Sequence, residues 1–171
     1  MAKPVPTVPT TGPSRAKRIT AATGIALTLA IPAEGLRQFA YYDPPGILTV
    51  CYGHTGADVQ KGRKYTLNEC AALLDTDMRL AIATVERCAP GLPAPTLAAF
   101  GDAVFNMGPT IACDRKKSTA ARHLYAGNVR AACDQLPRWD KARVLGVMVT
   151  LPGLTTRRAA ERAVCLQGIE A

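Results

Sequence analysis

The chain has 171 residues, a formal net charge of +8 and six cysteines. That length fits one domain, or one domain in two lobes, and an apolar content of 48% is enough for a packed core. The excess of cations indicates an anionic partner such as nucleic acid, anionic lipid or a cell-wall polymer, with solubility alone as the alternative. Because no helix-turn-helix signature or interleaved Arg/aromatic pattern is present, we do not expect nucleic acid to be the partner.

Residues 1–18 are rich in Pro and Thr and end in the cations Arg15, Lys17 and Arg18. We expect a disordered basic N-terminal segment, because this composition offers little apolar surface to bury. Residues 19–33 are uncharged and weakly apolar. As a helix they would reach about 22 Å, short of the roughly 30 Å hydrocarbon core of a bilayer, so they would make only a marginal membrane anchor. Residues 34–171 form the remaining predicted domain.

Glu34, Asp43 and Thr49 are the most informative residues of the chain. Glu34 would end a helix, Asp43 would sit on the first turn of a hairpin punctuated by Gly and Pro, and Thr49 would lie on the returning strand. Three polar side chains would then converge on one side of a cleft. Hydrolysis of a sugar linkage needs such a set, with one acid to protonate the leaving oxygen and one anion to hold a water or stabilise an oxocarbenium-like centre.

The remaining elements are predicted from periodicity and from turn and cap signals. Residues 39–65 carry short β-type runs between Gly and Pro, which favours a small antiparallel lobe of two or three strands. Thr66 and Glu69 form a capping box that would start a long helix through about residue 87. Further helices are predicted near 96–107, 118–126, 128–136 and 155–167. The pattern predicts an α+β fold in which the long helix joins a β lobe to an α lobe, with a cleft between them.

The six cysteines are scattered, with no CxxC pair. Cys51 and His54 have a spacing that suits zinc, but no second pair completes a site, so we expect no metal. An even number of spread cysteines indicates disulfides in an oxidising compartment, although some could be buried free thiols. Fifteen pairings are possible. Chain order suggests three pairs: Cys133 with Cys165, Cys51 with Cys70, and Cys88 with Cys113.

The spacing of Glu34, Asp43 and Thr49, followed by Tyr52-Gly53-His54-Thr55, resembles the phage-type lysozymes, which are the endolysin family. Three later blocks resemble that family's signatures in the same order, and they are residues 105–108, 132–139 and 151–162. The resemblance implies a lysozyme-like fold with a small antiparallel β lobe, a larger α-helical lobe and the active-site cleft between them. It also implies a monomeric muramidase that acts on peptidoglycan without a metal or organic cofactor.

The resemblance assigns catalytic roles to three residues. Glu34 would be the general acid, Asp43 would position the attacking water from the opposite face, and Thr49 would hydrogen-bond that water. Inversion at the anomeric carbon is the outcome expected from the family, and it requires a wide separation of the two carboxylates.

Further residues are candidates for binding substrate or for supporting the site. Tyr42 could line the cleft and bind substrate. His54 could bind substrate or act as a general base, although it is better explained as holding the hairpin. Asn106 and Gly108 could contact sugar groups or could simply end a helix. Arg157 or Arg158 could pair with Glu34 and position it, or could belong to a solvated basic face.

Three interpretations remain open for residues 19–33. The segment could be a signal anchor that is exported uncleaved, lodges in the inner membrane and then escapes into the periplasm, as in signal-anchor-release endolysins. It could be a cleaved secretion signal, or an ordinary helix packed on the domain of a cytoplasmic protein. The six cysteines favour export, and we expect the first interpretation.

Two rival functions also remain. A lytic transglycosylase needs only one acid and forms an anhydro product without water. A non-catalytic cationic protein that binds the cell wall or membrane would depend on its charge alone. We expect a bacteriophage endolysin that hydrolyses the β-1,4 bond between N-acetylmuramic acid and N-acetylglucosamine and lyses the host cell.

Overall fold

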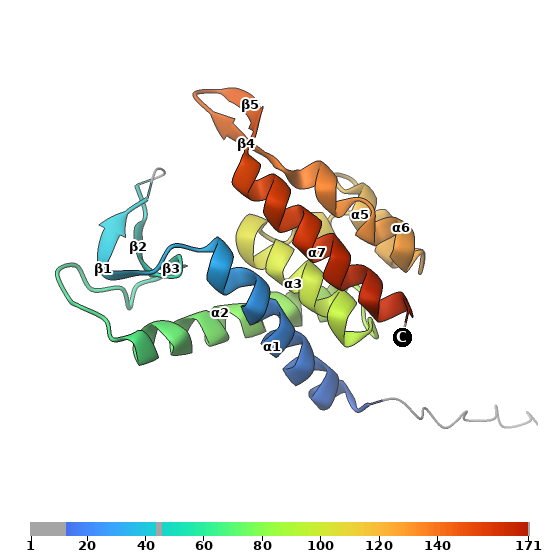
Figure 1. Ribbon diagram of the computed structural model, residues 1–171, viewed down its shortest axis with the longest axis horizontal. Coiled ribbons are helices and arrows are strands. Elements are labelled where there is room, and N and C mark those ends of the chain that lie inside the picture. The colour runs from blue at the N-terminus through green and yellow to red at the C-terminus, as the bar shows by residue number, and fades with distance from the viewer. Residues whose placement is uncertain (1–12, 44–45, 171) are drawn as a thin grey trace, which may run out of the picture.

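The computed structural model describes residues 13–43 and 46–170. The helices are α1 (Arg15–Ala33), α2 (Leu67–Cys88), α3 (Ala94–Met107), α4 (Thr110–Cys113), α5 (Thr119–Tyr125), α6 (Val129–Cys133), a 3₁₀ turn η1 (Leu136–Trp139) and α7 (Pro152–Glu170). The strands are β1 (Arg37–Tyr42), β2 (Leu48–Cys51), β3 (His54–Thr55), β4 (Lys141–Val144) and β5 (Val147–Thr150). Figure 1 shows a β lobe on one side, joined through α2 to a larger helical lobe built around α3. The predicted α+β architecture is confirmed.

Helix α1 is part of the core of the helical lobe, where it packs against α2 and α3 (Figure 1). It begins at Arg15, earlier than the predicted boundary at residue 19, while residues 1–12 lie outside the described part of the chain. Ala22, Ala26 and Ala30 are fully buried at a spacing of four residues, so small side chains form the face that meets α3. Within the described residues, no helix is both long and apolar enough to cross a membrane.

The β lobe is an antiparallel sheet in the order β1-β2-β3, as predicted for this region. Tyr41 pairs with Thr49, and Val50 pairs with His54, so the central strand carries both a buried apolar side chain and a buried hydroxyl. Val50 packs with Tyr65 in a small core of its own, separate from the core of the helical lobe. This second core gives the β lobe its own support on one side of the interlobe groove.

Helix α2 begins with the predicted capping box. The backbone N–H of Glu69 donates to Oγ1 of Thr66 at 3.2 Å, and the backbone N–H of Thr66 donates to the Glu69 carboxylate at 2.7 Å. The helix crosses α3 closely, because a Cβ at Gly101 would lie 2.2 Å from Cδ1 of Ile82. Helix α3 is therefore buried along most of its length, and both α1 and α7 pack against it.

The sequence analysis missed the hairpin formed by β4 and β5. Its two-residue turn is Leu145-Gly146, and both residues have positive φ, at 47° and 86°. Hairpins of this kind are usually signalled by Asn-Gly or Asp-Gly, so a Leu-Gly turn escaped notice. Helix α7 then begins at Pro152, before the predicted start at Thr155, because proline fits the first turn of a helix.

All three disulfides expected from chain order are present: Cys51–Cys70, Cys88–Cys113 and Cys133–Cys165. The first joins β2 to α2, the second joins α2 to α4, and the third joins α6 to α7. No described cysteine is free. The thiols are thus structural cross-links between elements, as the exported interpretations require.

Replacing Cys133 and Cys165 together by Ala is expected to lower the free energy of unfolding by about 2–4 kcal/mol. The bond links two residues that are 32 positions apart in the sequence. Its loss therefore increases the conformational entropy of the unfolded chain. Urea unfolding followed by circular dichroism measures the change, with the other two bonds checked by peptide mass mapping. An unfolding midpoint equal to that of the unmodified chain would contradict a stabilising role for this bond.

Candidate active site

Glu34 lies where the helical lobe meets the β lobe. It follows the last residue of α1, and its backbone N–H donates to the carbonyl of Ala30 at 2.9 Å, which ends the helix in an ordered way. One carboxylate oxygen accepts a hydrogen bond from Nη1 of Arg157 at 2.5 Å. The other faces the turn between β2 and β3, because a Cβ at Gly53 would lie 4.0 Å from it. With 23% of its side chain exposed, Glu34 is fixed yet accessible.

Arg157 is held in place by a buried carboxylate on α3. Its Nε and Nη2 donate to the two oxygens of Asp102 at 2.9 and 2.7 Å, a bidentate pair in which Asp102 has no exposed surface. Burial alone would lower the pKa of Arg157, but the hydrogen bonds and charges of Asp102 and Glu34 raise it above its ordinary value. The guanidinium is therefore a permanent cation that fixes the Glu34 carboxyl group.

Arg158 and Glu161 extend this cluster into the core. Nη2 of Arg158 lies 2.5 Å from Oε1 of Glu161 and also donates to Oδ1 of Asn106 at 3.1 Å, and both charged side chains are fully buried. Burial, together with the nearby carboxyl group of Asp102, raises the pKa of Glu161 to about 10.

Glu161→Gln is expected to flatten the dependence of stability on pH. The folded-state pKa of Glu161, about 10, lies above the ordinary 4.5, so the folded state holds a proton that the unfolded state releases between those values. The free energy of unfolding of the unmodified chain should therefore fall as pH rises, by up to about 1.4 kcal/mol per pH unit. Thermal unfolding at a series of pH values tests this, and equal slopes for both proteins would contradict it.

A cavity of about 640 Å³ opens beside Glu34. Its polar side chains include Glu34, Asn106 and Arg157, and its apolar wall comes from the end of α1 and the start of α7. The residues of that apolar wall are Leu29, Pro32, Ala33, Leu151, Gly153, Leu154 and Ala160. A concave apolar site with a few convergent polar groups is typical of ligand binding.

A second, smaller hollow of about 290 Å³ lies between the β lobe and helices α2 and α3. Gly53 and Thr55 line it from the β lobe, and Asp77, Val104 and Phe105 line it from the helices. Gly53 also faces Glu34, so the carboxylate stands between the two hollows.

Asp43 and Thr49 both hydrogen-bond to the backbone of Ile47, near the turn of the β1–β2 hairpin. The backbone N–H of Ile47 donates to Oδ1 of Asp43 at 2.7 Å, and Oγ1 of Thr49 donates to the carbonyl of Ile47 at 3.0 Å. Asp43 is partly exposed and Thr49 is buried. Neither residue lines the cavity beside Glu34, so the convergence of all three side chains stays a prediction.

His54 ties the β lobe to α2. Its Nδ1 lies 2.8 Å from Oδ2 of Asp77, and its Nε2 lies 3.2 Å from Oδ2 of Asp58. Burial alone would lower the pKa of His54, but the two carboxylates outweigh it and raise the pKa above 6.5. This geometry fits the expectation that His54 holds the hairpin, because both ring nitrogens are engaged away from the Glu34 cavity.

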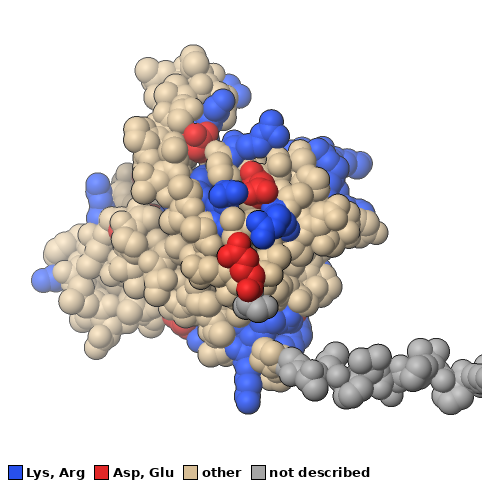
Figure 2. Space-filling model, turned by 45° about the vertical axis from the view of Figure 1, so that its right-hand side comes forward, with Lys and Arg blue, Asp and Glu red and all other residues tan. Residues whose placement is uncertain are grey.

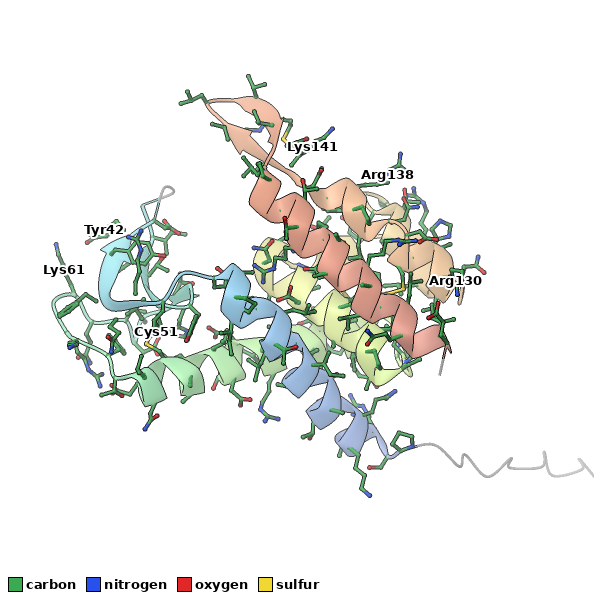
Figure 3. All side chains as sticks on the ribbon, in the orientation of Figure 1. Tyr42, Cys51, Lys61, Arg130, Arg138 and Lys141 are labelled. Carbon is green, nitrogen blue, oxygen red and sulfur yellow. A yellow bond between two sulfur atoms is a disulfide. The ribbon has the colours of Figure 1, made fainter. Side chains whose placement is uncertain are left out.

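The remaining predicted site residues are divided between the cavity and the surface. Asn106 lines the cavity, whereas Gly108 ends α3 with a φ of 82°, which is helix termination. Tyr42 does not reach the cavity. Its ring is largely exposed and lies under Nζ of Lys61 at 5.4 Å, on the outer side of the β lobe (Figure 3).

Asp102 and Glu161 escaped the sequence analysis. Asp102 stands alone in an otherwise apolar helix, and an acidic residue in such a place needs a buried cation. Glu161 follows Arg157 and Arg158 at spacings of four and three residues, the positions of neighbours on one helix face. Those two signals could have pointed to the buried cluster. Its contact with Glu34 had been expected for Arg157 or Arg158, and Arg157 makes it, whereas both arginines are buried and do not form a solvated face.

Residues 32–161 match the phage lysozyme family, so the chain belongs to that family. It is 41% identical over 139 residues to a SAR-endolysin of Bacteriophage PS119, and the match covers 79% of this chain and 77% of that protein. It is 38% identical over 140 residues to a SAR-endolysin of Enterobacteria phage P21, covering 79% and 78% of the two chains. The active form of the P1 phage endolysin Lyz has a similar structure, with a TM-score of 0.72, 26% identity, and coverage of 92% and 96%.

These matches confirm the lysozyme-like fold that the resemblance predicts. They also confirm that the chain belongs to the endolysins. The protein is a lysozyme-type glycoside hydrolase, an endolysin that serves in host lysis at the end of a bacteriophage cycle. The contacts of Glu34 define the candidate catalytic site.

Proposed function

We propose that this endolysin hydrolyses the β-1,4 bond between N-acetylmuramic acid and N-acetylglucosamine with Glu34 as the general acid. The observation that supports this most directly is the placement of the Glu34 carboxyl group. One oxygen is held by Arg157 at 2.5 Å, and the other faces Gly53 across the groove. An acid for glycoside cleavage must be immobile and must reach the leaving oxygen, and this carboxyl group is both fixed and accessible.

In the proposed reaction, protonated Glu34 gives its proton to the glycosidic oxygen as the bond to the anomeric carbon breaks. Asp43 and Thr49, both held at Ile47, would position a water that attacks from the opposite face and loses its proton to Asp43. The product would have the inverted configuration. Arg157, fixed by Asp102, stabilises the carboxylate that Glu34 becomes after proton transfer. The residues account for the reaction without a metal or organic cofactor.

The test is mass spectrometry of the fragments that the purified protein releases from isolated peptidoglycan. We expect fragments that end in reducing N-acetylmuramic acid from the unmodified protein, and none above background from Glu34→Gln. Anhydro ends would instead show a lytic transglycosylase, which does not need Asp43. Equal lysis by both proteins would overturn the assignment of Glu34.

We further propose that residues 19–33 serve first as a membrane anchor and then as the core of α1. The segment is uncharged and follows three cations, while its buried face consists of small residues that pack on α3. In the bilayer, the segment could not fill this place, and Glu34 could not reach Arg157. Tethering would thus keep the enzyme inactive in the inner membrane, and release into the periplasm would assemble the site.

The exposed face of α1 permits a direct test. Gly24 and Thr28 are exposed, and a Cβ at Gly24 would meet no atom within 4 Å, so Gly24→Leu with Thr28→Leu makes the segment more apolar without disturbing the core. We expect this variant to stay with the membrane fraction and to delay lysis, while Gly24→Ser with Thr28→Ser releases at least as readily as the unmodified chain. Prompt lysis by a fully membrane-retained, uncleaved variant would contradict the proposal.

A further inference from the structure

The hairpin of β4 and β5 projects from the helical lobe with an unusual amount of exposed apolar surface. Leu145 at its tip is fully exposed, and Val147 and Met148 are 65% and 54% exposed. Val144 and Val149 are also exposed. Figure 1 shows the hairpin at the opposite end of the molecule from the start of α1. Contiguous exposed apolar side chains mark an interaction surface, whereas single ones need no explanation.

The tip holds a leucine where the backbone disfavours one. Leu145 has a φ of 47°, in the left-handed region that glycine, asparagine and aspartate adopt most readily. A leucine there costs conformational energy, and its side chain is fully exposed, so it gains no packing within the protein. The exposed leucine at the tip is therefore not explained by packing within the protein.

Cations lie toward the base of this hairpin. Lys141 lies at the base of the hairpin, Arg138 lies just before it in η1, and Arg143 lies within β4, as Figure 3 shows for the first two. Residues 141–150 contain no Asp or Glu. The projecting top of the molecule in Figure 2 is mostly uncharged, with both basic and acidic side chains beside it. Asp140 lies directly before Lys141, where it accepts a hydrogen bond from Thr155, so the base of the hairpin is basic by excess of cations over this one acid.

That combination fits one kind of partner. A sugar polymer is bound by aromatic stacking and neutral hydrogen-bonding groups, and the hairpin offers no aromatic side chain and only the hydroxyl of Thr150. Aliphatic side chains flanked by Lys and Arg match the interface of a bilayer with anionic headgroups, where the tip enters the acyl boundary and the cations meet the phosphates. The same cations would repel a second copy of this hairpin.

We propose that the β4–β5 hairpin docks the folded enzyme on an anionic phospholipid bilayer, with Leu145 and Val147 inserted and Lys141 and Arg143 on the headgroups. This contact is separate from residues 19–33, because it uses the folded protein and the opposite end of the molecule. It would keep the enzyme next to a membrane after the anchor has left it. The inference does not depend on the identity of the bond that the enzyme cleaves.

The test is sedimentation of the full-length protein with vesicles of phosphatidylethanolamine and phosphatidylglycerol. Leu145→Asn with Val147→Thr suits both the left-handed turn and the strand, so the fold should be kept. We expect this variant to bind about tenfold more weakly. Lys141→Gln with Arg143→Gln should weaken vesicle binding by about tenfold. Added salt should also weaken vesicle binding by the unmodified protein.

The matched control is Leu67→Asn, because Leu67 is 60% exposed on α2 and lies outside the hairpin. It should bind vesicles as the unmodified protein does, and all variants should hydrolyse lipid-free peptidoglycan at the unmodified rate. Unchanged vesicle binding by both hairpin variants would overturn the proposal and assign binding to residues 19–33. Loss of hydrolysis without lipid would instead make the hairpin a wall of the substrate cleft. Self-association relieved by Leu145→Asn would make it a contact between copies.

Discussion

Glu34→Gln is expected to lower the rate of peptidoglycan hydrolysis by about 10²- to 10⁴-fold, the usual contribution of a general acid. The amide cannot give a proton to the leaving oxygen, yet it is the same size as the acid and can still accept the hydrogen bond from Arg157. The fold should therefore be retained, with a melting temperature close to that of the unmodified protein. Release of soluble fragments from isolated cell walls measures the rate.

A control for the change of charge is Glu170→Gln, because Glu170 is largely exposed and pairs with the exposed Arg130 at 3.5 Å. It makes the same change in net charge far from the groove, and it should keep full activity. If Glu34→Gln remained within about tenfold of the unmodified rate, the loss would be too small for a general acid, and another proton donor would have to be sought.

Arg157→Gln is expected to destabilise the protein by about 3–5 kcal/mol, the cost of leaving a buried charge without its partner. Asp102 has no exposed surface, and both of its oxygens are bound by Arg157. The melting temperature should fall by on the order of 10 °C. Activity should fall as well, because Glu34 loses the contact that holds it.

The control is Arg162→Gln, since Arg162 pairs with Asp134 at 2.6 Å on the same helix but both side chains are more than 40% exposed. An exposed pair contributes about 0–1 kcal/mol, so this variant should unfold almost as the unmodified protein does. Adding Asp102→Asn to Arg157→Gln should recover part of the loss, because the amide no longer leaves a buried charge. Equal destabilisation by the two arginine variants would refute the buried cluster as a structural unit.

The buried cluster also explains how one helix serves both stability and the site. Arg157 and Glu161 belong to α7, Asp102 belongs to α3, and Glu34 follows α1, so three helices meet at one set of charges. Removal of α1 from the core would leave Arg157 without Glu34 and would open the face of α3. The proposed role of Glu34 therefore predicts that activity depends on the docking of α1 onto α3.

Much of this architecture could be predicted from local signals in the sequence. The capping box of Thr66 and Glu69 placed the start of α2 correctly, and the Gly and Pro residues of 39–65 indicated a small sheet. Chain order suggested the three disulfides, since each pair joins neighbouring elements. The hairpin of β4 and β5 was missed because its turn uses Leu145, a residue that rarely takes positive φ.

The sequence by itself determined the family and the weak apolarity of residues 19–33, and it made Glu34 the candidate general acid, because these depend on residue types and spacing along the chain. Only the tertiary structure decided which of the two arginines holds Glu34 and which buried carboxylate holds that arginine. Arg157 reaches Glu34 across 123 residues and Asp102 across 55, and no local pattern encodes such distances. The protonated state of Glu161 likewise depends on burial among groups from two helices. Local sequence signals determine the helices and strands. Burial and long-range packing determine which charged side chains pair and which of them hold a proton.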